Sequence, residues 1–197
     1  PDYTGRPSET LVGVGDAAVP EGTTVRWLFQ TKDVAALTFC TGSGEVTLTP
    51  DANGRVEYVR RVMQGMDYGI TARSAWATGT DTISYSLSAI ADAAPLIAVE
   101  EVVDSLHPDR RLFRGRVKDD YGFSRLVFVH RTTNGADTAG KAVSEAEIGL
   151  KQGEASQEFY FSFNTAEIVL EPGDVLGYWF EVSDNDAIHG PKTTKSQ

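Results

Sequence analysis

Apolar and polar residues alternate along several short segments of this chain, which is the pattern of β-strands that bury one face. In the segment 23–31, Val25, Trp27 and Phe29 occupy alternate positions, and in the segment 81–90 large apolar residues again take every second position. Turn residues separate such segments at short intervals, and no stretch keeps a helical apolar period long enough for a substantial helix. The pattern predicts a chain that is nearly all β.

The dipeptide Asn53-Gly54 lies between two such segments, 45–49 and 55–62. Asn and Gly adopt positive φ angles more readily than other residues, as tight turns require. We therefore expect the two segments to form an antiparallel hairpin, in which Val56 and Tyr58 face inward.

A turn followed by a strand occurs twice in the chain, once before Tyr68 and once before Tyr178. An acidic turn followed by a strand also recurs at the same place in both halves. Repetition at this spacing predicts an all-β fold class with two tandem Ig-like or fibronectin-III-like β-sandwich domains, comprising residues 1–92 and 93–197.

Tyr68 and Tyr178 have a structural explanation within such domains. A tyrosine that enters the penultimate strand of an Ig-like sandwich can pack its ring inside and hydrogen-bond its hydroxyl across the preceding corner. We therefore expect both residues to be structural corner residues.

Several segments carry a resemblance to known families. Residues 170–174 with Tyr178, Phe180 and Val182 look like the corner of fibronectin type III domains. Most of the chain resembles an uncharacterised family of large bacterial membrane proteins, through the segments Tyr3–Pro7, Val19–Trp27, Asp119–Ser124 and Tyr178–Asp186.

Members of that bacterial family have transmembrane helices near the N-terminus and tandem Ig-like repeats outside the inner membrane, and some are labelled ATPases. The resemblance implies an extracytoplasmic location, in the periplasm or cell envelope, with a tether in a membrane segment absent from this chain. It supplies no catalytic residue. The chain begins at Pro1 without an initiator Met, so we expect a fragment of a longer protein.

The net charge of the chain limits the classes of partner that it is expected to bind. The chain has 28 acidic and 18 basic residues, a formal net charge of -10. Such a balance repels phosphate backbones and anionic headgroups, so we expect no nucleic-acid partner and no binding to a membrane surface. No apolar run approaches the roughly 18 to 20 residues that a membrane span needs, so we expect no direct membrane insertion. Cys40 is the single cysteine, which excludes an internal disulfide.

Residues 135–142 nearly match the motif of a phosphate-binding loop. Ala142 stands where that motif needs a hydroxyl for magnesium, and the preceding strand does not lead directly into the first glycine. We therefore expect a polar interaction loop over residues 132–141 rather than a nucleotide site. Its candidate contacts to a protein partner are Asn134, Asp137 and Lys141.

Acidic residues at two expected strand ends suggest a calcium site, formed by Asp119, Asp120, Asp184 and Asp186. Calcium binds six to eight oxygen ligands, and carboxylates supply them well. The alternative is that these residues are ordinary turn residues facing solvent. Apart from calcium, we expect no cofactor.

Two tryptophans, Trp76 and Trp179, are candidates for stacking on sugar rings. Trp179 is expected to point away from Tyr178 and Phe180, and Trp76 is expected near a loop. The sequence thus predicts a non-catalytic spacer or protein-interaction module, with a carbohydrate-binding module of the cell envelope as the alternative. A nucleotide-binding segment is a third interpretation, which rests on the ATPase label that some members of the similar bacterial family carry.

Overall fold

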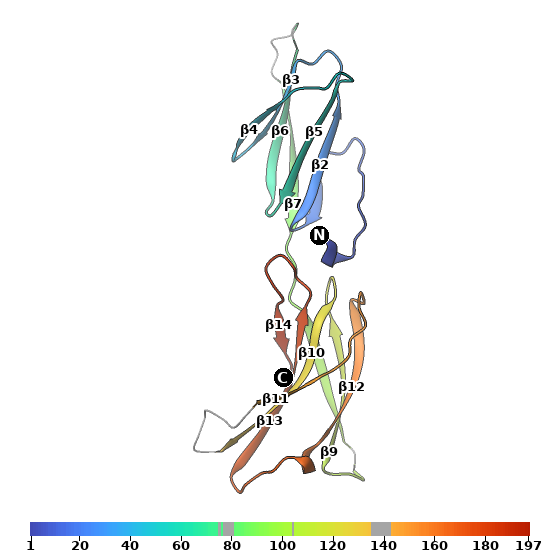
Figure 1. The fold of residues 1–197 in the computed structure, drawn as a ribbon, viewed down its shortest axis with the longest axis vertical. Helices are drawn as coiled ribbons and strands as arrows, with labels where there is room; N and C mark the ends of the chain where they lie inside the picture. The colour runs from blue at the N-terminus through green and yellow to red at the C-terminus, as the bar shows by residue number, and fades with distance from the viewer. Residues whose placement is uncertain (75, 77–80, 104, 135–142) are drawn as a thin grey trace. The chain divides into compact units, whose positions relative to one another are not determined.

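The computed structural model describes residues 1–197 except 75, 77–80, 104 and 135–142 (Figure 1). The chain divides into two compact units. The first unit comprises Pro1–Asp2 with Arg6–Asp92, and the second comprises Tyr3–Gly5 with Ala93–Gln197.

The described residues are nearly all β, which confirms the predicted fold class. Their only helices are two single 3-10 turns, η1 (Asp2–Thr4) and η2 (Thr165–Glu167). Among these residues, no helix has the length and apolarity that crossing a membrane requires.

Two sheets form the first unit, and their strands are β1 (Ala17–Pro20), β2 (Thr23–Gln30), β3 (Ala36–Thr41), β4 (Gly44–Leu48), β5 (Arg55–Val62), β6 (Met66–Arg73) and β7 (Thr82–Ile90). Five strands are ordered β1-β7-β6-β3-β4, and β2 pairs with β5 in the other sheet. The pairing of β1 with β7 is parallel, whereas the other pairs are antiparallel.

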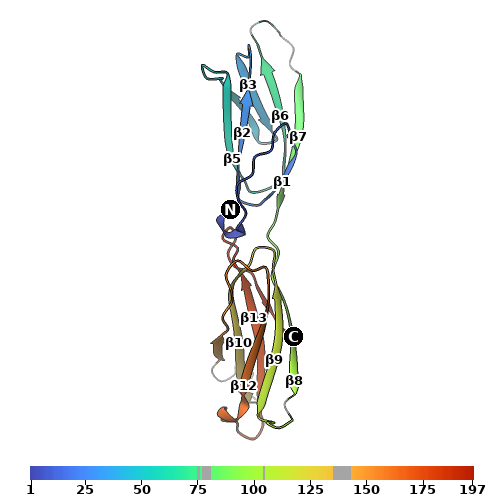
Figure 2. The same ribbon diagram turned by 90° about the vertical axis from the view of Figure 1, so that its right-hand side faces the viewer.

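Two sheets also form the second unit (Figure 2), and their strands are β8 (Leu96–Val103), β9 (Arg110–Lys118), β10 (Phe123–Asn134), β11 (Val143–Glu147), β12 (Ser156–Asn164), β13 (Asp174–Asp184) and β14 (Thr193–Lys195). One sheet has the order β11-β10-β13-β14 and the other the order β12-β9-β8. All of these pairs are antiparallel.

The two units use their repeated segments in the same way. β6, which carries Tyr68, lies between β3 and β7, and β13, which carries Tyr178, lies between β10 and β14. β3 and β10 are the strands that follow the two acidic turns. The repeat seen in the sequence therefore corresponds to equivalent central strands, and the tandem Ig-like sandwich prediction is confirmed.

Each unit buries aromatic side chains between its sheets. In the first unit, Phe39 is fully buried and stacks on Tyr68 with ring centroids 4.9 Å apart. Trp27 packs edge-on against Phe39 at 5.1 Å, as the bulky face of its strand predicts. In the second unit, Phe128 and Phe180 are 5.1 Å apart at the centre of the core. Burying such a ring contributes about 1.5–3 kcal/mol.

The hairpin predicted around Asn53-Gly54 is wrong. The turn itself is present, because Gly54 has φ 74° and the Asp51 side chain accepts hydrogen bonds from the backbone N–H groups of Asn53 and Arg55. The strands on either side, however, belong to different sheets: β4 pairs with β3, and β5 pairs with β2. The turn thus carries the chain from one layer of the sandwich to the other.

Candidate functional surfaces

Asp184 and Asp186, at the end of β13, lie inside the second unit with exposed fractions of 0% and 1%. The Lys192 ammonium is 2.7 Å from Asp186 Oδ2 and 3.4 Å from Asp184 Oδ2. Backbone N–H groups of Ile188 and His189 donate to Asp186 Oδ1. Burial acts to raise the pKa of Asp186, but these hydrogen bonds and the ammonium hold that pKa below its usual value.

Asp119 is also buried, and it organises the turn between β9 and β10. Its Oδ2 accepts hydrogen bonds from the backbone N–H groups of Tyr121 and Gly122, at 2.9 and 2.8 Å. Its Oδ1 is buried without a hydrogen-bond partner in the described part of the chain. Burial, together with the charges of Asp120 and Asp184, raises the pKa of Asp119 despite those two hydrogen bonds.

Asn185 joins this turn to the end of β13. Its Nδ2 donates to the Tyr121 carbonyl at 3.2 Å and to the Tyr3 carbonyl at 3.0 Å. Tyr3 packs edge-on against Tyr121, with ring centroids 5.7 Å apart, which accounts for the grouping of Tyr3–Gly5 with the second unit. The Asn185 side chain therefore connects the two predicted acidic turns through hydrogen bonds.

The four acidic residues predicted to bind calcium are held by different partners. Asp184 and Asp186 share Lys192, Asp119 caps its own turn, and Asp120 accepts from the Ala93 backbone N–H at 3.4 Å. Within the described ranges, no group of three or more His, Cys, Asp or Glu side chains is arranged to hold a metal ion. Calcium stays a prediction from the sequence, and Lys192 is the residue that sequence reasoning missed.

Tyr68 and Tyr178 donate hydroxyl hydrogen bonds to segments other than the turn that precedes their strands. Tyr68 is 3% exposed, and its hydroxyl donates to the Gly15 carbonyl on the segment that leads to β1. Tyr178 is half-buried, and its hydroxyl donates to Glu101 Oε2 at 3.2 Å. Glu101 also pairs with Arg111 at 2.8 Å. Each tyrosine thus ties its strand to a sequence-distant segment of the same unit.

The tryptophans proposed for sugar stacking differ in their surroundings. Trp76, in the first unit, is 90% exposed. Trp179, in the second unit, is half-buried and donates its indole N–H to Glu181 at 2.7 Å, while Lys195 Nζ lies 5.3 Å from its ring centroid. As its strand position predicts, Trp179 takes no part in the core that contains Tyr178 and Phe180. Trp76 is the one with a ring open to a ligand.

The predicted interaction loop lies mostly outside the described residues. Asp137 and Lys141 fall within 135–142, and only the backbone of Asn134, paired with Asp174, is described. The near-match to a phosphate-binding loop falls in the same segment.

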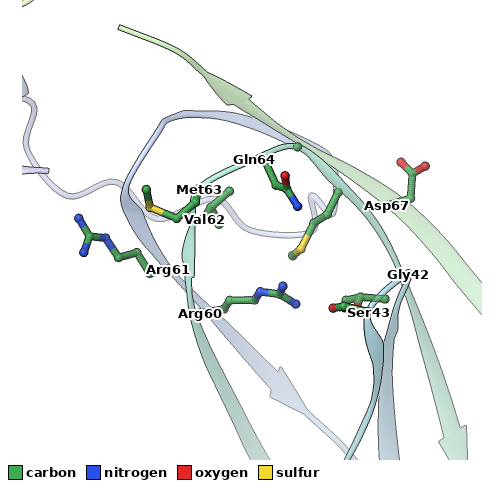
Figure 3. A pocket seen from close by; sticks show the side chains of 11 residues that line it. Gly42, Ser43, Arg60, Arg61, Val62, Met63, Gln64 and Asp67 are labelled. Carbon is green, nitrogen blue, oxygen red and sulfur yellow. Dashed lines mark hydrogen bonds between the residues drawn. The ribbon is translucent and has the colours of Figure 1, made fainter. Parts of the chain in front are cut away.

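A hollow of about 580 Å³ lies in the first unit, where the β3–β4 and β5–β6 turns meet (Figure 3). Figure 3 shows the Arg60 side chain extending across the hollow towards Ser43, and Gln64 pointing in from the rim. Arg61 and Asp67 point away from it. The lining combines the Arg60 guanidinium and neutral polar groups with the apolar side chains of Val62, Met63 and Met66, so it favours no single class of ligand.

Comparison with known proteins shows neither a family nor a function for this chain. No family model and no curated protein matches the chain. Solved structures similar to it include a DUF3823 family protein from Bacteroides ovatus (10% identity, TM-score 0.30, covering 89% of this chain and 98% of that one). The fibronectin(III)-like modules of Clostridium thermocellum CbhA match at 12% identity and a TM-score of 0.31, covering 94% and 90%.

A chicken TCR structure matches at 12% identity and a TM-score of 0.34, covering 93% of this chain and 97% of that one. Scores this low carry no argument about activity or partners.

Proposed function

We propose that the chain is a non-catalytic spacer and protein-interaction module from the extracytoplasmic part of a larger bacterial envelope protein. The resemblance of its segments to that family supports the location. The observation that carries the interaction role is a group of exposed apolar side chains at one end of the second unit.

This apolar end is built from two connections of the second unit, β8–β9 and η2–β13, and from the ends of the strands β8 and β13 beside them. Its members are Val102, Val103, Leu106, Val169, Leu170 and Val175. Leu106 is 84% exposed and Val169 is 88% exposed. Figures 1 and 2 both place η2 and the β8–β9 connection at this end, and the Thr165 N–H donates to the Asp109 carbonyl at 2.8 Å.

Exposed apolar residues scattered singly are ordinary on protein surfaces, whereas several gathered together mark an interaction site. The core of the second unit does not need these side chains, because its centre is filled by phenylalanines. A protein contact gains most from burying such groups, since removing apolar area from water is favourable. The apolar end is thus the contact surface for the partner.

The test compares capture of envelope proteins by the parent chain and by the double variant Leu106→Ser/Val169→Ser. Both side chains are almost fully exposed, so we expect an unchanged melting temperature with loss of a specific captured protein. The control is Val12→Ser, which alters an equally exposed apolar residue of the first unit (88% exposed). Equal capture by the parent and the double variant would disprove this contact surface.

Carbohydrate binding is the second candidate, and the exposed ring of Trp76 favours it. A ring this open can stack on a sugar without rearrangement, whereas Trp179 is engaged by Glu181 and Lys195. We expect Trp76→Ala to reduce retention on an envelope polysaccharide and Trp179→Ala to leave it unchanged. Retention that survives Trp76→Ala would exclude this site.

A further inference from the structure

The outward face of the three-stranded sheet in the second unit carries a line of cations. Its central strand is β9, flanked by β12 and β8. Along β9, Phe113, Gly115 and Val117 are buried, so the alternate positions face solvent. Those outward positions are Arg110, Leu112, Arg114, Arg116 and Lys118.

The neighbouring strands supply fewer countercharges on this face. Glu158 of β12 lies opposite Arg116, and Glu100 of β8 lies opposite Arg114. Four cations therefore face two carboxylates here, although the whole chain has a net charge of -10. We call the outward positions of β9, with their neighbours on β12 and β8, the cationic face.

Existing ion pairs leave much of this charge open to solvent. Glu158 is shared by Arg116, at 2.6 Å, and Arg114, at 3.3 Å, and those arginine side chains remain 65% and 52% exposed. The Arg110 Nε donates to the Ser162 hydroxyl at 2.8 Å, and the Lys118 side chain makes no hydrogen bond or ion pair within the described residues. One carboxylate cannot occupy the five donors of each guanidinium.

Tyr160 adds an aromatic surface to the same face. It lies opposite Arg114 on β12 and is 69% exposed. Its neighbours along the outward side of β12 are Ser162 and Glu158, which can exchange hydrogen bonds with hydroxyl groups. An exposed ring on the outward face of a sheet, flanked by charged and hydroxyl side chains, matches a sugar ring that bears both acidic and hydroxyl groups.

We propose that the cationic face binds an acidic polysaccharide. Carboxylates or sulfates along the polymer pair with cations that follow one another about 7 Å apart on β9, and one sugar ring stacks on Tyr160. The cationic face borders the apolar end, because Val102 of β8 lies opposite Leu112 of β9. The proposed protein contact is tested at Leu106 and Val169, which lie outside the cationic face, so the two proposals are independent. Nucleic acid fits less well, because proteins that bind single strands stack successive bases on several aromatic side chains, whereas this face offers the single exposed ring of Tyr160 among its described residues.

The experiment measures binding of the whole chain to polygalacturonate by calorimetry, in the presence of a chelator, with dextran as the neutral polymer. We expect binding to polygalacturonate that weakens with salt, and none to dextran. The variant Arg116→Gln/Lys118→Gln should weaken binding about tenfold or more, because it removes two charge-assisted contacts. Tyr160→Ala should also weaken it, whereas Tyr160→Phe should keep most of it.

The control is Arg26→Gln/Arg55→Gln, which makes the same change of net charge on exposed positions of the first unit. We expect it to alter affinity by less than about twofold, as for substitutions outside a contact. The proposal is overturned if the chain does not bind polygalacturonate, or if the control weakens binding as much as the test variant. Equal affinity for single-stranded DNA or for anionic lipid vesicles would also overturn it. Melting temperatures of all variants show that each is folded.

Discussion

Lys192 places an ammonium against two carboxylates that lie wholly inside the second unit. Its Nζ is 2.7 Å from Asp186 and 3.4 Å from Asp184, both of which have fully buried side chains. Replacing Lys192 with Met keeps the length of the side chain but removes the charge. The variant would leave two neighbouring anions without their cation, so we expect the second unit to lose much of its stability.

The contacts of Asp184 and Asp186 determine how much free energy of unfolding the Lys192→Met variant should lose. Removing one partner of a buried ion pair costs about 3–5 kcal/mol. The lower end applies here, because both carboxylates keep backbone N–H donors and the Lys192 side chain is 31% exposed. In a unit of this size, about 3 kcal/mol corresponds to a fall in melting temperature of roughly 12 °C.

Differential scanning calorimetry of the whole chain measures this fall, because the transition that moves belongs to the second unit. The matched control is Lys151→Met, whose side chain is 79% exposed and pairs with Glu154 at 3.5 Å. An exposed pair of this kind contributes about 0–1 kcal/mol, so the control should melt within a few degrees of the parent. Similar melting temperatures for Lys192→Met and Lys151→Met would refute the assigned role of Lys192.

Three further predictions concern the same unit. Calcium should raise the melting temperature of the second unit more in Lys192→Met than in the unmutated chain, because only the variant leaves the carboxylates without a cation. A titration of the melting temperature with calcium and chelator checks this. The raised pKa of Asp119 means that its contribution to stability is present below its usual pKa and is lost as the pH rises through the folded value. Asp119→Asn should therefore melt higher than the parent at neutral pH, with a gain that shrinks on acidification, and a lower melting temperature at neutral pH would contradict that sign. At Gly115, an added Cβ would lie 2.1 Å from the Phe159 ring, so Gly115→Ala should lower the free energy of unfolding of the unit by about 1–3 kcal/mol, measured by urea unfolding. Gly149→Ala is the control, because the space there is open, and it should cost less than about 1 kcal/mol.

Local patterns in the sequence were sufficient for the strands and for the repeat. Val25, Trp27 and Phe29 alternate because one face of β2 packs on the core, and that alternation is visible in the sequence. Trp179 likewise points away from Tyr178 and Phe180, as successive strand residues must. These features depend only on neighbouring positions.

Pairing between strands depends on distant segments, which is where prediction failed. The Asn53-Gly54 turn has the conformation its residues favour, but nothing local distinguishes a hairpin from a change of sheet. The same limit applies to Lys192, six residues beyond Asp186, because its role depends on the burial of both carboxylates. The cationic face was hidden by the net charge, although Arg114, Arg116 and Lys118 follow one another at strand spacing.

Site-specific photo-crosslinking tests the interaction role, in cells that produce the larger protein of which this chain is proposed to be a part. A photoreactive residue at Leu106 or at Val169 reports contacts of the apolar end, and one at Val12 serves as the control position. We expect one defined adduct with an envelope protein from both test positions and none from the control. Cells in which neither test position gives an adduct, or in which the control gives the same one, would contradict it.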